Sequence, residues 1–194
     1  MSLVEMLVVV SIFSIAMLAL MTSVSTLYRA NSYAIAQAYE IFNARSGVQT
    51  LVRDMREMSF ADDGSFPLAR KEAHLIGFYS DIDRDASVEY VEYELISSTN
   101  LIKRIYNASN TIPMYNLSSP DETIVVSEYI QNIVFGTPTF VFFDGVGNEV
   151  VSSGSVTDVQ YIQSQVIVNV DAARNPGQFM LRGSAALRNI TNGL

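Results

Sequence analysis

The sequence has no cysteine and a single histidine, His74, and these two shortages narrow the chemistry available to it. Without cysteine there is no disulfide or thiol chemistry, and the compartment cannot be read from cysteine usage. A Ser–His–Asp arrangement would have to be built around His74, which lies in an apolar, strand-like run. Neither a phosphate-binding glycine loop nor a zinc-ligand spacing is present in the sequence. The sequence therefore predicts that the protein is not an enzyme.

Charged residues are scarce at the front of the chain. No Lys or Arg precedes Arg29, and Glu5 is the only acidic residue before it. Residues 1–60 are electrically balanced, so the net charge of −8 falls entirely on residues 61–194. An acidic surface of this kind repels the phosphates of nucleic acids, and we expect no bulk binding to DNA or RNA.

Proline and glycine are absent from a long N-terminal stretch, in which the first glycine is Gly47 and the first proline is Pro67. Residues 6–21 are apolar except for two serines. A run of about 20 such residues is long enough to cross a membrane core, and it lacks the basic flank of a secretory signal.

Beyond this run, apolar residues recur at three, four or seven positions, which is the spacing of one helix face. The pattern predicts one N-terminal helix as a domain over residues 1–58. Within it, residues 1–28 form an anchor for a membrane or a filament core, and residues 29–58 form an amphipathic half.

From residue 59 onward the pattern changes to short runs rich in Val, Ile, Tyr and Phe, separated by turn residues. It predicts a mostly antiparallel β-rich head over residues 59–194, against which the rear of the helix packs, and therefore an α+β fold. One predicted strand is the long run TIVVSEYIQNIVFG. In another, VEYVEYEL, the alternation changes phase at Tyr90–Val91, which predicts a β-bulge.

Glu5 is an anomaly, because a carboxylate inside a bilayer costs about 2.5–3.5 kcal/mol near the centre and less toward the ends. The nearest basic side chain, Arg29, lies about 36 Å away along the helix. The only nearby cation is the α-amino group of Met1, if that residue is the mature terminus. Glu5 can pair with such an amine within one chain or between neighbouring chains shifted along the axis, and the second arrangement gives a polymer.

The N-terminal sequence MSLVEMLVVVSIFSI resembles the start of a mature type IV pilin or type II secretion pseudopilin. That family has a hydrophobic residue at the first mature position, a small residue such as serine at the second and glutamate at the fifth; here these are Met1, Ser2 and Glu5. The segments IGFYSDIDRDASVEYVEYELISSTNLIKRIY, FVFFDGVGNEV and AALRN resemble the heads of J-like minor pseudopilins and PilW-like pilins. Met1 in place of the commoner Phe, and the lack of a proline near position 22, depart from the pattern of many major pilins.

The resemblance implies a pilin-like fold and a structural role in a type IV pilus-like or pseudopilus filament. In this family a prepilin peptidase removes a short basic leader and the new terminus, here Met1, is N-methylated. The resemblance also implies that Glu5 sets the docking and register of each incoming subunit. The implied partners are further copies of the chain, other pilins, the prepilin peptidase and the inner-membrane assembly machinery. The implied location is the inner membrane before assembly, then an extracellular filament on the cell surface or a periplasmic pseudopilus.

A different class of function remains open on the sequence. The chain could be a single-span membrane protein whose β head binds a ligand or partner while the helix only tethers it. In that interpretation Met1 is a start residue, Glu5 lies among the lipid headgroups, and no filament forms.

Acidic residues recur at the spacing of a calcium loop in the segment DIDRDASVEYVE. The oxygen-ligand offsets 1, 3, 5, 7, 9 and 12 of an EF-hand fall on Asp81, Asp83, Asp85, Ser87, Glu89 and Glu92. The glycine that such a loop carries at offset 6 is replaced by Ala86. Two interpretations are open: a Ca²⁺ site with Asp81, Asp83, Asp85 and Glu92 as ligands, or an acidic turn at the start of a hairpin. No other cofactor is expected.

Overall fold

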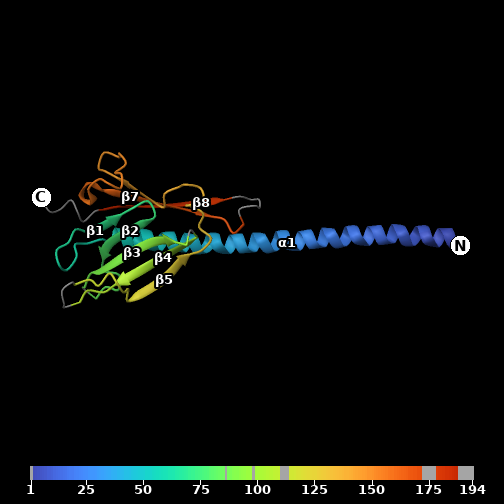
Figure 1. Ribbon diagram of the computed structural model, residues 1–194, viewed down its shortest axis with the longest axis horizontal. Coiled ribbons are helices and arrows are strands. Elements are labelled where there is room, and N and C mark those ends of the chain that lie inside the picture. The colour runs from blue at the N-terminus through green and yellow to red at the C-terminus, as the bar shows by residue number, and fades with distance from the viewer. Residues whose placement is uncertain (1, 86, 98, 110–113, 172–177, 188–194) are drawn as a thin grey trace. The chain divides into compact units, whose positions relative to one another are not determined.

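The computed structural model describes residues 2–85, 87–97, 99–109, 114–171 and 178–187. Within these residues the chain has one long α-helix and eight strands in two antiparallel sheets (Figure 1). This arrangement confirms the predicted α+β fold class.

Helix α1 spans Leu3–Arg56, a run of 54 residues. It is continuous because no proline removes a backbone donor and the first glycine comes only at Gly47. The chain divides into two compact units, Met1–Tyr39 and Glu40–Leu194, so the second unit contains the last turns of α1 together with all the strands. The domain boundary at residue 58, placed at the end of the predicted helix, stays a prediction.

The larger sheet has five strands in the order of the sequence, each antiparallel to its neighbour. In Figure 1 these strands lie side by side. Their bounds are β1 Leu68–Lys71, β2 Leu75–Ser80, β3 Glu89–Ile96, β4 Asn100–Tyr106 and β5 Glu122–Ser127.

The smaller sheet has three antiparallel strands, with β7 between β6 and β8. A short 3₁₀ helix, Val156–Asp158, precedes β7. The strand bounds are β6 Phe140–Phe143, β7 Tyr161–Val168 and β8 Phe179–Ala186.

The predicted bulge at Tyr90–Val91 is wrong. Strands β2 and β3 pair in unbroken register from Ser80↔Glu89 to Leu75↔Glu94. The apolar pattern loses its alternation because β3 is a central strand in which five successive residues, from Glu89 to Tyr93, are buried. A strand covered on both faces does not need alternating polarity.

The long run predicted as one strand ends early, because β5 stops at Ser127. Tyr129 has a φ of 56°, a left-handed conformation that a strand cannot continue through. After this turn the chain joins the other sheet through an isolated bridge between Ile130 and Val168. The segment therefore connects the two sheets instead of extending one of them.

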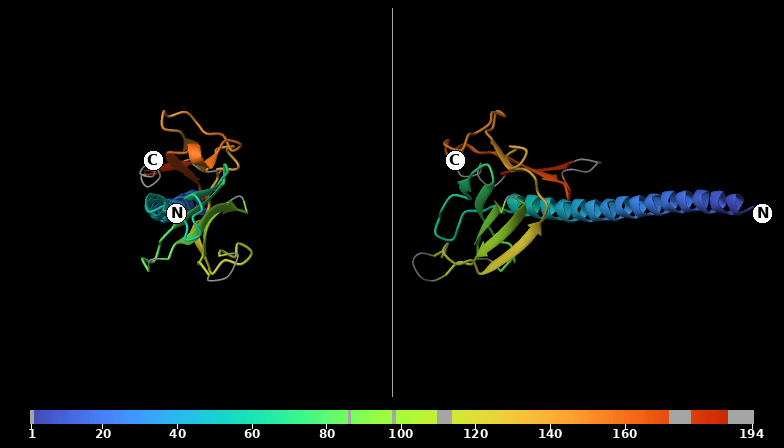
Figure 2. Two further views of the ribbon diagram at one scale, coloured as in Figure 1. Left: turned by 90° about the vertical axis from the view of Figure 1, so that its left-hand side faces the viewer. Right: turned by 45° about the vertical axis from the view of Figure 1, so that its right-hand side comes forward.

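The core of the second unit gathers side chains from the rear of α1 and from both sheets. Val48, Leu51 and Met55 lie on successive turns of one helix face and are buried. Figure 2 shows the two sheets on different sides of this helical segment. The strand residues in the same cluster include Phe78, Val91, Tyr93, Leu101, Phe140, Ile162 and Val166.

Glycine allows the helix and the strands to approach closely at two points. A Cβ at Gly183 of β8 would lie 2.6 Å from Val48 Cγ1 and 2.7 Å from Val52 Cγ2. A Cβ at Gly47 of the helix would lie 2.5 Å from Val126 Cγ1 of β5. These distances are shorter than two non-bonded carbon atoms tolerate, so both positions require a residue without a side chain.

Candidate functional site

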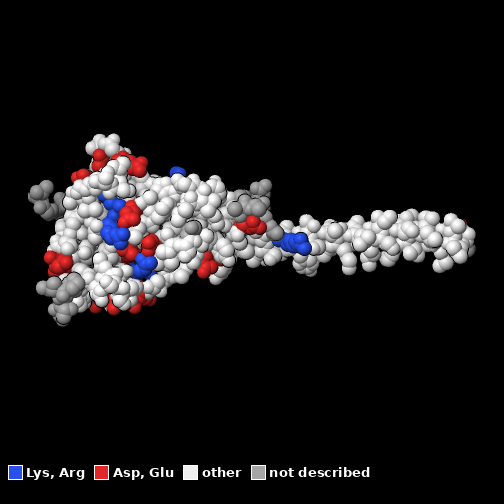
Figure 3. Space-filling view, viewed as in Figure 1, with Lys and Arg blue, Asp and Glu red and all other residues white. Residues whose placement is uncertain are grey.

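The helix of the first unit is long enough and apolar enough to cross a membrane, judged by its length and composition. None of its most apolar 18-residue window is buried within the chain. In the space-filling view this part of the helix is almost uniformly uncharged (Figure 3). Its surface therefore suits contact with lipid or with other apolar helices.

The hydroxyl groups on this apolar helix are bonded within the helix. Ser11, Ser14 and Thr22 donate to the carbonyl oxygen four residues earlier, at 2.8, 2.8 and 2.6 Å. Thr26 does the same at 2.9 Å. A hydroxyl satisfied in this way can enter an apolar environment without leaving an unpaired donor. The helix is continuous through residues 22–26 in the structure.

Glu5 has a partner that the sequence argument missed. Its Oε2 accepts a hydrogen bond from the backbone N–H of Ser2 at 2.7 Å, and its own N–H donates to Ser2 Oγ at 3.3 Å. These reciprocal bonds form a capping box, which satisfies two of the free donors at a helix N-terminus. The signal was present as a serine followed three residues later by glutamate.

The capping box leaves Glu5 partly available. Its Oε1 makes no hydrogen bond or ion pair with any residue that the structure describes, and the side chain is exposed. The predicted pairing of Glu5 with the amine of Met1 involves a residue outside the described part of the chain. Glu5 can therefore cap its own helix and still accept a cation from outside.

The acidic segment after β2 brings together only some of the predicted calcium ligands. Carboxylate oxygens of Asp81, Asp83 and Glu89 lie within 4.8 Å of one another. Asp85 is outside this group, and its Oδ1 accepts the Ser87 N–H at 2.8 Å. Sequence reasoning placed Glu89 at a ligand offset but did not choose it as a ligand.

Glu92 lies in a different network, on β3. It forms ion pairs with Arg104 at 2.7 Å and with Arg70 at 3.0 Å, and it is buried. Residues 89 and 92 point to opposite faces of the strand, because side chains alternate along it. Glu92 is thus not placed to complete a calcium loop with the acidic cluster.

Each of the three clustered carboxylates already accepts a hydrogen bond from a nearby backbone N–H. Asp81 accepts from the Arg84 N–H at 2.7 Å, Asp83 from the Asp85 N–H at 3.1 Å, and Glu89 from the Ile82 N–H at 2.8 Å. Burial raises the pKa of Glu89 above its usual value. Oxygen atoms at this separation could hold a hard cation, and the same bonds are typical of a turn without one. The calcium site stays a prediction.

His74 is engaged in the head. Its Nδ1 lies 3.0 Å from Thr139 Oγ1, and burial lowers the pKa of its ring below the usual value. This contact joins the start of β2 to the start of β6. The geometry gives His74 a packing role; the absence of enzymatic activity stays a prediction.

A buried ion pair was not predicted from the sequence. Lys103 Nζ on β4 lies 2.6 Å from Asp54 Oδ2 on α1, and the Tyr93 hydroxyl donates to the same oxygen at 2.7 Å. All three side chains are buried. Burial, then the nearby Asp54 charge, raise the pKa of Tyr93 well above its usual value. This network fixes the last turns of the helix on the larger sheet.

Two features suggested a filament protein: the apolar N-terminal helix, which is continuous, and the glutamate at its start. The resemblance to type IV pilins stays a prediction. Comparison of the chain with protein-family models, with curated proteins and with solved structures gives no match.

Proposed function

We propose that this protein is a structural, non-catalytic subunit of a type IV pilus-like or pseudopilus filament. The observation that carries the proposal is the most apolar 18-residue window of the helix, none of which is buried against the residues that the structure describes. Exposed large apolar side chains on successive turns are costly in water, and packing against the same helix of other copies removes them from it. Polymerisation through this helix is the proposed mechanism.

Glu5 gives the polymer its register in this proposal. The capping box uses one carboxylate oxygen and leaves Oε1 available, so an incoming subunit can present its terminal amine to the charge. Low dielectric inside a bundle of apolar helices strengthens such a pair. N-methylation of the terminus would retain its positive charge.

The proposed partners follow from the same mechanism. They are further copies of this chain, other pilins, a prepilin peptidase and the inner-membrane assembly machinery. The proposed location is the inner membrane before assembly, and afterwards a filament on the cell surface or a pseudopilus in the periplasm.

The test separates the charge of Glu5 from its capping role. Glu5→Gln removes the charge, and glutamine at this position still supports a capping box. Ser2→Ala removes the hydroxyl acceptor of the box and keeps the charge. We expect filaments sheared from producing cells to be lost with Glu5→Gln and Glu5→Ala, and to persist with Ser2→Ala. Membrane levels of each variant, measured by immunoblot, serve as the control for insertion.

Wild-type filament yield from Glu5→Gln would refute the register role. Electron microscopy of the wild-type filaments, with immunogold labelling of this chain, supplies the second readout. Filaments that contain none of this chain, or no filaments at all, would overturn the proposal.

One observation favours the second candidate, a single-span protein that tethers a ligand-binding head. The capping box gives Glu5 a partner in its own chain, so the carboxylate does not require a neighbouring subunit. In that case all the Glu5 and Ser2 variants accumulate normally in the membrane, and the wild-type chain never leaves it.

A further inference from the structure

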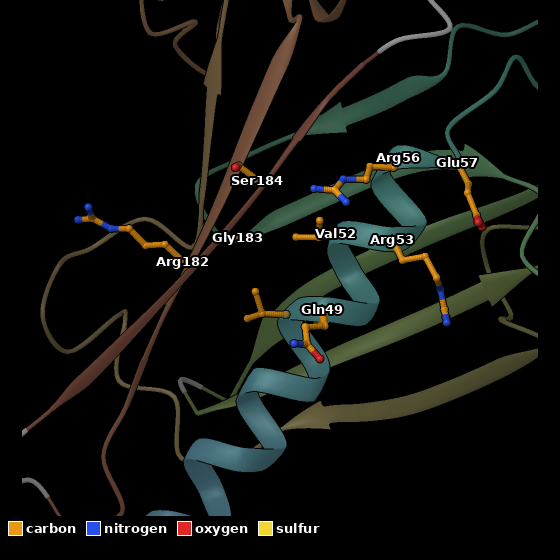
Figure 4. A pocket seen from close by; sticks show the side chains of 9 residues that line it. Gln49, Val52, Arg53, Arg56, Glu57, Arg182, Gly183 and Ser184 are labelled. Atoms are coloured by element: carbon orange, nitrogen blue, oxygen red, sulfur yellow. The ribbon is translucent and has the colours of Figure 1, made fainter.

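A groove runs between the last turns of α1 and strand β8, within the second unit (Figure 4). Its volume is about 580 Å³, and its lining includes Val52 and Arg56 of the helix and Arg182 and Ser184 of the strand. An adjoining cavity of about 420 Å³ is lined by Arg56, Ser184, Tyr161 and Ala186. The two cavities share Arg56 and Ser184, so they adjoin one another along β8.

The groove is basic, although the chain as a whole is acidic. Arg56 and Arg182 line it, and neither has an ion-pair partner among the residues that the structure describes. Figure 4 shows Arg56 extending from the helix toward β8, whereas Arg182 extends from β8 away from the helix. The acidic residue of the wall, Glu57, is already paired with Arg84 at 3.5 Å. An anionic group is therefore attracted along this side of β8.

Strand β8 also has a free edge beside the groove. It pairs with β7 on one side, and its other side makes no strand pairing within the described residues. An unpaired edge presents a row of backbone donors and acceptors that can pair with a strand from another chain. The occupant that fits the groove is thus an extended segment with negative charge.

The chain itself carries such a segment at the edge of its other sheet. Among the residues that the structure describes, strand β5 pairs with β4 alone, and its residues from Glu122 to Val125 are exposed. Asp121 precedes the strand and Glu128 follows it, both exposed. No Lys or Arg occurs anywhere in residues 105–173. The free edge of β5 is therefore acidic, whereas the free edge of β8 is basic.

We propose that β5 of one copy pairs edge to edge with β8 of a second copy, with Glu122 and the acidic residues that flank the strand against Arg56 and Arg182. The contact is heterologous, because it joins two different surfaces, and repeated contacts of this kind give an open chain of subunits. The inference rests on the proposed filament function and deepens it, since it names a head-to-head contact that adds to the helix packing.

Charge reversal tests the contact in producing cells with the full chain. Arg182→Glu and Glu122→Arg each place like charges together, and we expect each to lower the mass of sheared filaments by about tenfold or more. The double variant Arg182→Glu/Glu122→Arg restores the opposite charges and should recover most of the yield. Glu149→Arg, an exposed reversal away from both edges, controls for the change in net charge. Wild-type yield from both single variants would overturn the inference.

Cross-linking provides a second test that does not depend on filament yield. Because the sequence has no native cysteine, only the introduced cysteines can react. Neighbouring strands lie about 4.7–4.9 Å apart, within reach of a short bismaleimide. Thr123→Cys on β5 and Ser184→Cys on β8 are combined in one chain, with Val125→Cys and Arg182→Cys as second positions in case of a shifted register. We expect a ladder of multimers from the double variants, dimers from mixed single variants and monomers from each single variant alone.

The outcomes separate this inference from the proposed function. Wild-type filaments together with unaffected edge variants and no ladder would overturn the edge contact alone. Absence of wild-type filaments would overturn the proposed function, and a ladder formed in the membrane would then still support the contact. Dimers from Ser184→Cys alone would show a symmetric pairing of β8 with itself and would also overturn the inference.

Discussion

The two parts of helix α1 share one secondary structure and differ in what covers them. Over residues 3–32 every side chain is exposed, and Leu18 is 67% exposed. In the second unit, Leu51 of the same helix is completely buried among residues of both sheets. The rear of the helix packs within its own chain, whereas residues 3–32 stay exposed throughout the part of the chain that the structure describes.

This difference shows which part of the molecule is stabilised by contacts within its own chain. The head closes its core around residues 44–55 of the helix and pairs the buried Lys103 with Asp54, so its stability depends on its own contacts. The apolar front has neither a core nor an ion pair among the described residues, and its surface suits contact with lipid or with other apolar helices. Stability measurements should therefore respond to substitutions in the rear, and assembly measurements to substitutions in the front.

The largest expected effect on stability comes from breaking the buried ion pair. Asp54→Ala leaves Lys103 buried without a counter-charge, and we expect the free energy of unfolding of the head to fall by about 3–5 kcal/mol. Urea unfolding of the full chain in detergent micelles, followed by tyrosine fluorescence, measures it. Glu94→Ala is the matched control, because its partly exposed pair with Arg104 is worth about 0–1 kcal/mol. Equal effects of the two substitutions would contradict the role assigned to Asp54.

The next largest effect on stability is expected from creating a cavity in the core. Two Leu→Ala substitutions, one in each half of the helix, make the comparison direct. Leu51→Ala should destabilise the head by about 2–5 kcal/mol, because the side chain is fully buried. Leu20→Ala, at a position 61% exposed, should change the unfolding of the head by less than about 0.5 kcal/mol. Both are measured by the same urea titration. A large effect from Leu20→Ala would mean that the head depends on the front of the helix.

Much of the fold could be predicted from the sequence, because hydrophobic periodicity is local. The helix ends at Arg56, close to the predicted end at residue 58, because an uninterrupted pattern with no proline leaves few alternatives. Strand β1 was not predicted, since LARK is four residues long and shows no alternation. Strand partners and the division into two sheets depend on long-range contacts that no short pattern contains.

The candidate site was predictable in part. Glu5 stood out because one charge in an apolar run is conspicuous, and its capping box was readable from Ser2 as well. The ligand spacing of a calcium loop did not predict the position of Glu92, because the Glu92 side chain on β3 forms ion pairs with two arginines. The Asp54–Lys103 pair joins residues 49 positions apart, and only the folded sheet brings them together.

A smaller effect is expected where β8 approaches the helix. Gly183→Ala places a Cβ against Val48 and Val52, and because both are short, stiff side chains the backbone of β8 must shift. Overpacking of this kind costs about 1–3 kcal/mol of unfolding free energy. Ser184→Ala, at the next residue, should be nearly neutral and controls for the strand. An unchanged urea midpoint for Gly183→Ala would show that the helix and β8 can separate at no cost.

The smallest expected effect is a dependence of head stability on alkaline pH. Tyr115 packs against Tyr79 in a small cluster apart from the main core, and its hydroxyl donates to the Val88 carbonyl at 2.8 Å. Burial, with the nearby carboxylates, raises the pKa of Tyr115 to about 12. An unfolded tyrosine ionises near pH 10, so the contribution of this group is complete below about pH 10 and is lost as the pH rises through about 12.

The urea midpoint of the head should therefore fall between about pH 10 and pH 12, and Tyr115→Phe should make that fall shallower, because phenylalanine has no proton to lose in either state. Loss of the hydrogen bond to Val88 lowers the midpoint of this variant at pH 7 as well, so the slope with pH and not the absolute midpoint tests the assignment. Neighbouring tyrosines with raised pKa values, Tyr79 and Tyr106 among them, keep some of the slope. An identical slope in Tyr115→Phe and the wild-type chain would show that the alkaline loss of stability comes from those other tyrosines, and that the Tyr115 hydroxyl is as well solvated in the folded head as in the unfolded chain.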